Sequence, residues 1–201
     1  MANNHYYTND ENLKHNRKTW QTMLNGFNMQ FTSDNGVFSK NTIDFGSRVL
    51  IESFSLEVTS GKILDVGCGY GPMGLTVAKA FPTSQVDLVD VNLRALELTK
   101  ENAKLNQVAN VRVYESSVYE SVKDEDYQAI ISNPPIRAGK QVVHAILEGA
   151  YTHLKTGGEL WIVIQKKQGG PSAKAKMETV FGNVEQVTKE KGYFIFKSIK
   201  E

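Results

Sequence analysis

Short apolar runs alternate with longer mixed segments from residue 62 to the end of the chain. Apolar runs bounded by glycine, proline or acidic residues are typical of buried strands, whereas apolar residues at helical spacing are typical of amphipathic helices. The pattern predicts strands at residues 63–66, 85–89, 111–114, 127–132, 159–164, 183–188 and 193–198. It predicts helices at residues 72–80, 93–105, 141–154 and 172–181, the last with Ser172 as its N-cap.

This alternation predicts an α/β fold in which helices cover both faces of a mostly parallel sheet. The last two strands are separated only by a short turn at Lys191-Gly192. A parallel crossover needs about a dozen linking residues or more, so these two strands must form an antiparallel hairpin. We therefore predict a Rossmann-like sheet of seven strands, one of them antiparallel.

The N-terminal part of the chain has a different pattern. Residues 18–24 and 27–32 flank Asn25-Gly26, a strong signal for a β-hairpin, and residues 43–54 have helical spacing with Asp44 near their start. We predict a flexible lead-in at residues 1–17 followed by one domain at residues 18–201. That domain would consist of a small cap, residues 18–60, and a core, residues 61–201.

Composition narrows the class of protein. Apolar residues make up 40% of the 201 residues and charged residues 22%, as in ordinary soluble domains. A net charge of +1 gives no global indication of a nucleic-acid partner. The single cysteine, Cys68, and the scattered histidines predict neither a disulfide framework nor a metal site. With no signal-like or membrane-spanning apolar stretch, we expect a cytoplasmic protein without a membrane partner.

A glycine-rich loop follows the first strand of the core, in the order Asp65-Val-Gly67-Cys-Gly69-Tyr-Gly71. Dinucleotide sites have the spacing G-x-G-x-x-G, whereas this loop is G-x-G-x-G after an acid. S-adenosylmethionine carries a zwitterionic amino-acid end instead of a pyrophosphate, and Asp65 could receive its ammonium group directly or through water. An ordinary glycine-rich turn remains the alternative.

Other candidate cofactor residues lie at the ends of the next strands, where ligands of open α/β sheets bind. Asp90 is placed to accept both ribose hydroxyls, although a solvated acid at a strand end is also possible. Ser117, or the backbone N–H of Val118, should lie near adenine. The predicted cofactor-binding residues are Asp65, Gly67, Cys68, Gly69, Gly71, Asp90, Val91, Ser117, Val118 and Asn133.

Asn133-Pro134-Pro135-Ile136 follows the strand at residues 127–132. A planar amino group is a poor nucleophile, because its lone pair is delocalised. The Asn133 side-chain oxygen and the Pro134 carbonyl are suited to hold its two N–H bonds, and the prolines fix the loop. We predict that Asn133 and Pro134 are the catalytic residues, with an Asx turn before two prolines as the alternative. Cys68 lies in the cofactor loop, which argues against cysteine-dependent methylation of a pyrimidine carbon.

Four segments together resemble one family: Asn35-Gly-Val-Phe-Ser39, Ile43-Asp-Phe-Gly-Ser47, Ile63-Leu-Asp-Val-Gly-Cys-Gly-Tyr-Gly71 and Ser132-Asn-Pro-Pro135. They occur in this order in small-subunit rRNA guanine-N2 methyltransferases of the RsmC type, and the resemblance covers about residues 18–200. It implies S-adenosylmethionine as cofactor, S-adenosylhomocysteine as product, and 16S rRNA or the small ribosomal subunit as partner. It also implies a single catalytic half, as a monomer or weak homodimer.

Two rivals remain open. DNA adenine-N6 and protein glutamine-N5 methyltransferases carry a similar Asn-Pro-Pro motif, so the motif alone does not name the nucleophile. The Gly-Val-Phe-Ser segment favours guanine-N2. A non-catalytic cofactor-binding scaffold is the second rival, and the intact Asn133-Pro134-Pro135 argues against it.

The substrate side departs from the family at Ile136, where relatives carry an aromatic residue that stacks on the base. Phe38 is the first candidate for a ring that stacks on the base, and Tyr70 is the second. Residues 165–177 contain four lysines and no acid, and would form a basic loop near the site or merely a solvated mobile loop. The predicted substrate-binding residues are Phe38, Pro135, Ile136, Arg137, Lys166 and Lys167.

Overall fold

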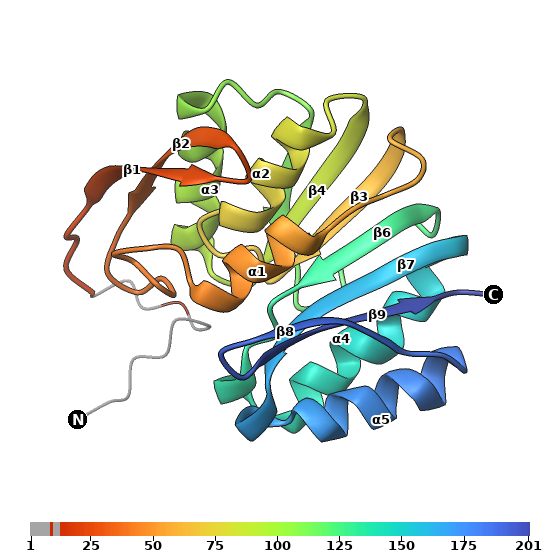
Figure 1. Ribbon diagram of the computed structural model, residues 1–201. Helices are drawn as coiled ribbons and strands as arrows, with labels where there is room; N and C mark the ends of the chain where they lie inside the picture. Colours follow the sequence, from red (N-terminus) through yellow and green to blue (C-terminus); the bar gives the residue numbers. More distant parts are fainter. Residues whose placement is uncertain (1–8, 10–12) are drawn as a thin grey trace.

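The computed structural model describes residue 9 and residues 13–201 (Figure 1). Its strands are β1 Lys18–Leu24, β2 Phe27–Ser33, β3 Gly61–Val66, β4 Ser84–Asp90, β5 Val111–Glu115, β6 Tyr127–Ser132, β7 Leu154–Gln165, β8 Glu185–Glu190 and β9 Tyr193–Ile199. Its α-helices are α1 Phe45–Ser53, α2 Pro72–Ala80, α3 Leu93–Leu105, α4 Lys140–His153 and α5 Gly170–Phe181. Two short 3-10 helices, η1 Ile136–Ala138 and η2 Lys166–Gln168, follow β6 and β7.

The predicted sheet is confirmed. Its seven strands run in the order β5-β4-β3-β6-β7-β9-β8, and β9 is antiparallel to both neighbours. The chain builds outward from β3 through β4 and β5, then returns to the other side of β3 with β6. This reversal makes the carboxyl ends of β3 and β6 the expected place for a ligand. The Ser132 hydroxyl, at the end of β6, donates to the Val66 carbonyl across that junction (2.8 Å).

Helices cover both faces of the sheet, as Figure 1 shows. Alternate side chains of the strands point to opposite faces, so two separate apolar clusters form. Ile63, Ala129 and Ile131 belong to the cluster under α1, α2 and α3. Leu64 and Ile130 belong to the cluster under α4 and α5. The central strands are therefore apolar on both faces, which explains their continuous apolar runs.

Both predicted hairpin turns are present. Asn25 and Gly26 join β1 to β2, while Lys191 and Gly192 join β8 to β9, and all four residues have positive φ. Two consecutive residues with positive φ are the requirement of a type I′ turn, which matches the twist of the strands. Local conformational preference therefore determines both connections.

The N-terminal hairpin docks on α3 through side-chain amides. Asn102 donates to the Thr32 carbonyl (3.0 Å) and accepts from the Thr32 N–H (2.7 Å). Asn106 pairs with the backbone of Gln30 in the same way. These amides occupy the free edge of β2 as a neighbouring strand would. The β1–β2 hairpin is therefore attached rigidly to the core.

Some predicted boundaries were wrong. The segment predicted as a basic loop is largely helical: α5 begins at Gly170 and its N-cap is Gly169, not Ser172. Pro171, in the first turn of α5, favours this earlier start. Strand β7 begins at Leu154, several residues before the predicted start at residue 159.

The predicted lead-in falls mainly on residues 1–8 and 10–12, which lie outside the described residues. In the part of the chain that the structure describes, no helix combines the length and the apolar character needed to cross a bilayer.

Candidate active site

A cavity of about 820 Å³ opens at the carboxyl ends of β3, β4, β6 and β7. It lies at the reversal of strand order, where the topology predicts a ligand. One end is lined by the glycine loop and the end of β4. The other end is lined by the segment after β6, by the end of β7 and by the chain that leads into α1.

The glycine loop is shaped by its backbone. Gly67 and Gly69 have φ of 77° and 58°, a region that glycine enters at little cost. The N–H groups of Gly67 and Cys68 both donate to the Val89 carbonyl, which anchors the loop to β4. A Cβ atom at Gly67 or Gly69 would meet no other atom within 4 Å, so the loop presents bare backbone on an open side. That surface can approach a ligand closely.

Asp65 is fully buried beneath the loop and does not line the cavity. Its Oδ2 accepts from the Gly74 N–H in the first turn of α2 (2.8 Å), whereas its Oδ1 has no hydrogen-bond partner among the described residues. Burial raises the pKa of Asp65 to about 7, with a further contribution from the charge of Asp90, against the opposing hydrogen bond from Gly74. This geometry does not favour direct contact with a ligand and leaves the water-mediated contact as the prediction.

Asp90 ends β4 and lines the cavity. Its two carboxylate oxygens accept from the backbone N–H groups of Gly69 (2.8 Å) and Asn92 (2.9 Å). Burial raises the pKa of Asp90, while these N–H donors act to lower it. The carboxylate is therefore fixed in place and keeps lone pairs for ligand hydroxyl groups.

Val118 lines the same end of the cavity with φ of 54°. Positive φ is a genuine outlier for a β-branched residue, and such strain is often found at functional sites. The Ser116 hydroxyl supports this turn, since it donates to the Val118 carbonyl and accepts from the Ser121 N–H, both at 3.0 Å. Ser117 and Val91 line the cavity beside it.

Cys68 also lines the cavity but is buried, and burial raises the pKa of its thiol well above its ordinary value. The nucleophilic form of cysteine is the thiolate, which such a site disfavours. Its Sγ donates to the neighbouring Gly69 carbonyl (3.6 Å) and also interacts with the Thr99 side chain. Cys68 is therefore a small packing residue of the loop.

Asn133 lies where the two ends of the cavity meet. Its Nδ2 donates to Asp44 Oδ2 (3.1 Å) and to Ser47 Oγ (2.9 Å). Both acceptors come from the start of α1, far away in the sequence. The Asn133 Oδ1 has no hydrogen bond within the described part of the chain, so it is available to accept one from a ligand. Pro134 and Pro135 continue the wall of the cavity.

The far end of the cavity is lined by Phe38, Ile136, Arg137, Gln165 and Tyr193, among others. Phe38 is 41% exposed, which suits a surface on which a base could stack.

Tyr70 is not suited to such stacking, since its side chain is buried and its ring packs edge-on against Trp20 and Phe31. Its hydroxyl donates to the Ser39 carbonyl instead (3.1 Å), which ties the chain leading into α1 to the glycine loop.

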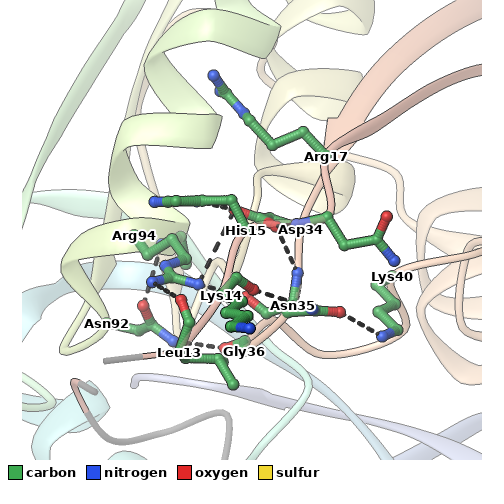
Figure 2. A network of polar contacts seen from close by, with 12 residues as sticks. Leu13, Lys14, His15, Arg17, Asp34, Asn35, Gly36, Lys40, Asn92 and Arg94 are labelled. Atoms are coloured by element: carbon green, nitrogen blue, oxygen red, sulfur yellow. Dashed lines mark hydrogen bonds and ion pairs between the residues drawn. The ribbon is translucent and has the colours of Figure 1, made fainter. Parts of the chain in front are cut away.

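A polar network holds the segment of residues 34–40 against the N-terminus of α3 (Figure 2). Asn92 donates to the Gly36 carbonyl (2.8 Å), and Arg94 donates to the carbonyls of Asn35 (3.2 Å) and Leu13 (2.8 Å). The buried Asp34 accepts from the Asn16 N–H and pairs with His15. The loop that carries Phe38 is therefore fixed to the same strand end that carries Asp90.

Lys166 and Lys167 lie on η2 and do not line the cavity, although Gln165 and Gln168 on either side of them do. The two lysines are exposed at its rim. Of the other two lysines of this segment, Lys176 is paired with Glu148 (2.6 Å), while Lys174 is exposed on α5. The basic character at the rim thus comes mainly from η2.

Most of the predicted site residues converge on this one cavity. Those that line it are Phe38, Gly67, Cys68, Gly69, Asp90, Val91, Ser117, Val118, Asn133, Pro134, Pro135, Ile136 and Arg137. Asp65, Gly71, Lys166 and Lys167 do not line it. Asp44 and Ser47 were missed as site residues, although both stand in a segment of the family resemblance. No cluster of three or more potential metal ligands occurs among the described residues.

The chain matches the family model described as the methyltransferase small domain over residues 28–197. It is 52% identical to a Bacillus subtilis protein, named uncharacterized protein YbxB, over 98% of both chains. It is 32% identical to ribosomal RNA small subunit methyltransferase C of Erwinia tasmaniensis, over 82% of this chain and 48% of that protein. The chain therefore spans about half the length of that rRNA methyltransferase.

Among solved structures, the chain resembles the Thermus thermophilus 16S rRNA N2 G1207 methyltransferase RsmC, which was solved in complex with AdoMet and guanosine. The TM-score is 0.82 at 22% identity, over 92% of this chain and 51% of that one. This likeness confirms the fold.

Proposed function

Because this chain belongs to the methyltransferase small domain family, we propose that it transfers a methyl group from S-adenosylmethionine to the exocyclic N2 amine of a guanine in small-subunit rRNA. The observation that carries the proposal is the orientation of the Asn133 side-chain amide. Both hydrogen bonds of its Nδ2 go to Asp44 and Ser47, so its Oδ1 is free to accept a hydrogen bond in the cavity.

The residues of the glycine-loop end fit S-adenosylmethionine. The open backbone at Gly67 and Gly69 leaves room for its amino-acid portion, and the unpaired Oδ1 of buried Asp65 can take up the ammonium group through water. Asp90 would hold the ribose hydroxyls, and the strained turn at Val118 would border adenine. When bound, the cofactor supplies an electrophilic methyl group on a sulfonium.

Asn133 and Pro134 supply the chemistry that a guanine amine needs. The Asn133 Oδ1 and the Pro134 carbonyl would each accept one N–H of the amine, which turns the nitrogen lone pair toward the methyl group. Orientation of this kind can lower a barrier by up to about 7–11 kcal/mol. Because transfer leaves a neutral thioether and an acidified amine, no strong general base is required.

Guanine in rRNA is favoured over other amine substrates by three features. The relatives named ribosomal RNA small subunit methyltransferase C share more than 30% identity with this chain. The exposed Phe38 ring offers a stacking surface where Ile136 cannot, and base stacking on aromatic rings is worth about 1–3 kcal/mol. Exposed Lys166 and Lys167 at the cavity rim suit contact with phosphates.

The proposal is tested by transfer of labelled methyl from S-adenosylmethionine to small ribosomal subunits from cells that lack the gene. Label in rRNA, recovered as N2-methylguanosine by mass spectrometry of nucleosides, is the expected result. Label in N6-methyladenosine or in protein glutamine would show that the acceptor is another amino or amide nitrogen and not guanine N2. Binding of the cofactor with label in no macromolecule would favour the scaffold.

A further inference from the structure

The contact between Asn133 and the start of α1 has a chemical direction. A side-chain amide can be turned by half a rotation, which exchanges its oxygen and its NH₂ group at almost the same positions. The catalytic role proposed for Asn133 requires its oxygen to face the substrate. Something must therefore hold the NH₂ group on the other side.

Asp44 meets this requirement because an ionised carboxylate can only accept hydrogen bonds. Its Oδ2 already accepts from the Ser47 N–H (3.0 Å), which makes Asp44 the N-cap of α1 and fixes the carboxylate in place. The same Oδ2 accepts from Asn133 Nδ2 at 3.1 Å. If Asn133 were turned, two oxygens would face each other at this distance with no proton between them.

Ser47 completes the arrangement. Its hydroxyl accepts the second proton of Asn133 Nδ2 (2.9 Å), and the same hydroxyl lies 3.5 Å from Asp44 Oδ2, to which it can donate. With its own proton directed at Asp44, the hydroxyl presents a lone pair to Asn133. Both residues thus favour the same orientation of the amide.

We propose that Asp44 and Ser47 are positioning residues that set the orientation of the Asn133 amide, and that the N-terminal cap thereby completes the active site. This inference rests on the proposed function, since it assigns the means by which Asn133 presents its oxygen to the amine. Asp44 and Ser47 act through Asn133 and not on the methyl group. The Tyr70–Ser39 hydrogen bond keeps the preceding segment in register for this contact.

The test uses Asp44→Ser, because serine is about as good an N-cap as aspartate but its side chain is too short to keep the contact with Asn133. We expect kcat to fall by about ten-fold to a hundred-fold, with Tm, cofactor Kd and substrate KM little changed. Glu52→Gln is the matched control, since it removes another carboxylate of α1 whose only partner within the described residues is Arg48. Its kcat should equal that of the wild type.

A double-mutant cycle with Asn133→Ala then separates positioning from other roles. If Asp44 acts through Asn133, Asp44→Ser should cause no further loss of kcat in the Asn133→Ala background. An equal loss in both backgrounds would overturn the inference, as would a normal kcat in Asp44→Ser. A fully active Asn133→Ala variant would instead count against the proposed function itself.

A second readout needs no substrate and no intact activity. The side-chain NH₂ protons of Asn133, assigned by their absence in Asn133→Ala, should be shifted and protected from exchange in the wild type. Asp44→Asn, which keeps the cap but can also donate, should lose part of that shift and protection. Unchanged signals in Asp44→Asn and in Ser47→Ala together would show that neither residue holds the amide.

Discussion

The two ends of the cavity, named here after the cofactor and the substrate that they are proposed to bind, are built differently. The cofactor end comes from the loops that follow β3, β4 and β5, consecutive strands of one sheet, and much of it is backbone held at positive φ. The substrate end is assembled from side chains far apart in the sequence, such as Phe38, Asn133 and Tyr193. Its central contact, between Asn133 and Asp44, joins residues 89 positions apart. Cofactor affinity should therefore depend on the cofactor end, and kcat on the substrate end.

The largest effect should come from the substrate end. We expect Asn133→Ala to lower kcat by at least about a hundred-fold, because the amine is no longer oriented, which corresponds to about 2.7 kcal/mol or more of transition-state stabilisation. Cofactor Kd should stay within a few-fold. Steady-state kinetics and calorimetry with S-adenosylhomocysteine measure the two quantities. Near-normal turnover would remove Asn133 from the mechanism, and with it the division between the two ends.

The same division explains how much could be predicted from the sequence. The α/β alternation predicted the sheet. Because ligand-binding loops follow strand ends, it also led to the prediction of Asp90 and Val118, both of which line the cavity. These relations are local along the chain. The contact of Asp44 with Asn133 could not be predicted, since it exists only because α1 packs beside β7 and β9. From the sequence, Asp44 was identified only as a helix start, which is also true.

The basic segment was predicted incorrectly for a local reason. Ser172 is a good N-cap residue, but Gly169, with φ of 107°, and Pro171 in the first turn begin α5 earlier. As a result, Lys174 and Lys176 lie on a helix and Lys176 is paired with Glu148. Of the four lysines, the exposed pair on η2, Lys166 and Lys167, is then the one that the proposed RNA substrate would contact.

A smaller effect is expected at the cofactor end. Asp90→Ala should weaken binding of S-adenosylhomocysteine by about 1–3 kcal/mol, because charge-assisted hydrogen bonds to the ribose are lost. Calorimetry measures the loss. Since Asp90 also accepts from the N–H groups of Gly69 and Asn92, Tm must be recorded to show that the loop remains folded. Unchanged affinity in a folded variant would exclude Asp90 from the site. Weaker binding with unchanged kcat at saturation would support the division between a cofactor end and a substrate end.

The raised pKa of Asp65 predicts that binding of S-adenosylhomocysteine depends on pH. Its pKa of about 7 means that it is mostly protonated at pH 6 and mostly ionised at pH 8. If the ionised form receives the ammonium group through water, Kd for S-adenosylhomocysteine should improve about ten-fold between these values, as the ionised fraction rises. Asp65→Asn, measured alongside, corrects for titration of the ligand and of Asp90. An equal pH dependence in the variant would show that Asp65 serves only as a partner of the Gly74 N–H.

The pH dependence of stability has the opposite sign to the pH dependence of binding. Because the pKa of Asp65 is raised above its ordinary value of 3.8, Asp65 binds more protons in the folded protein without cofactor than in the unfolded chain between about pH 4 and 7. Its contribution to the free energy of unfolding should therefore fall as pH rises through this window. Urea unfolding of the wild type and Asp65→Asn at several pH values measures it, and bound cofactor should reduce the difference.

The smallest effect should come from the rim of the substrate end. Lys166→Ala with Lys167→Ala should raise KM for the RNA substrate a few-fold and leave saturated kcat and cofactor Kd nearly unchanged, because contacts to phosphates position a nucleic acid without taking part in chemistry. The dependence of log K on log salt should flatten by about 0.7–0.9 for each lost phosphate contact. Lys123→Ala with Lys155→Ala is the matched control, since it removes the same charge from exposed positions just before β6 and at the start of β7, at the opposite edge of the sheet. If both pairs change KM equally, net charge and not the rim attracts the RNA; if neither does, the rim does not carry the RNA and the proposed rRNA substrate loses its electrostatic support.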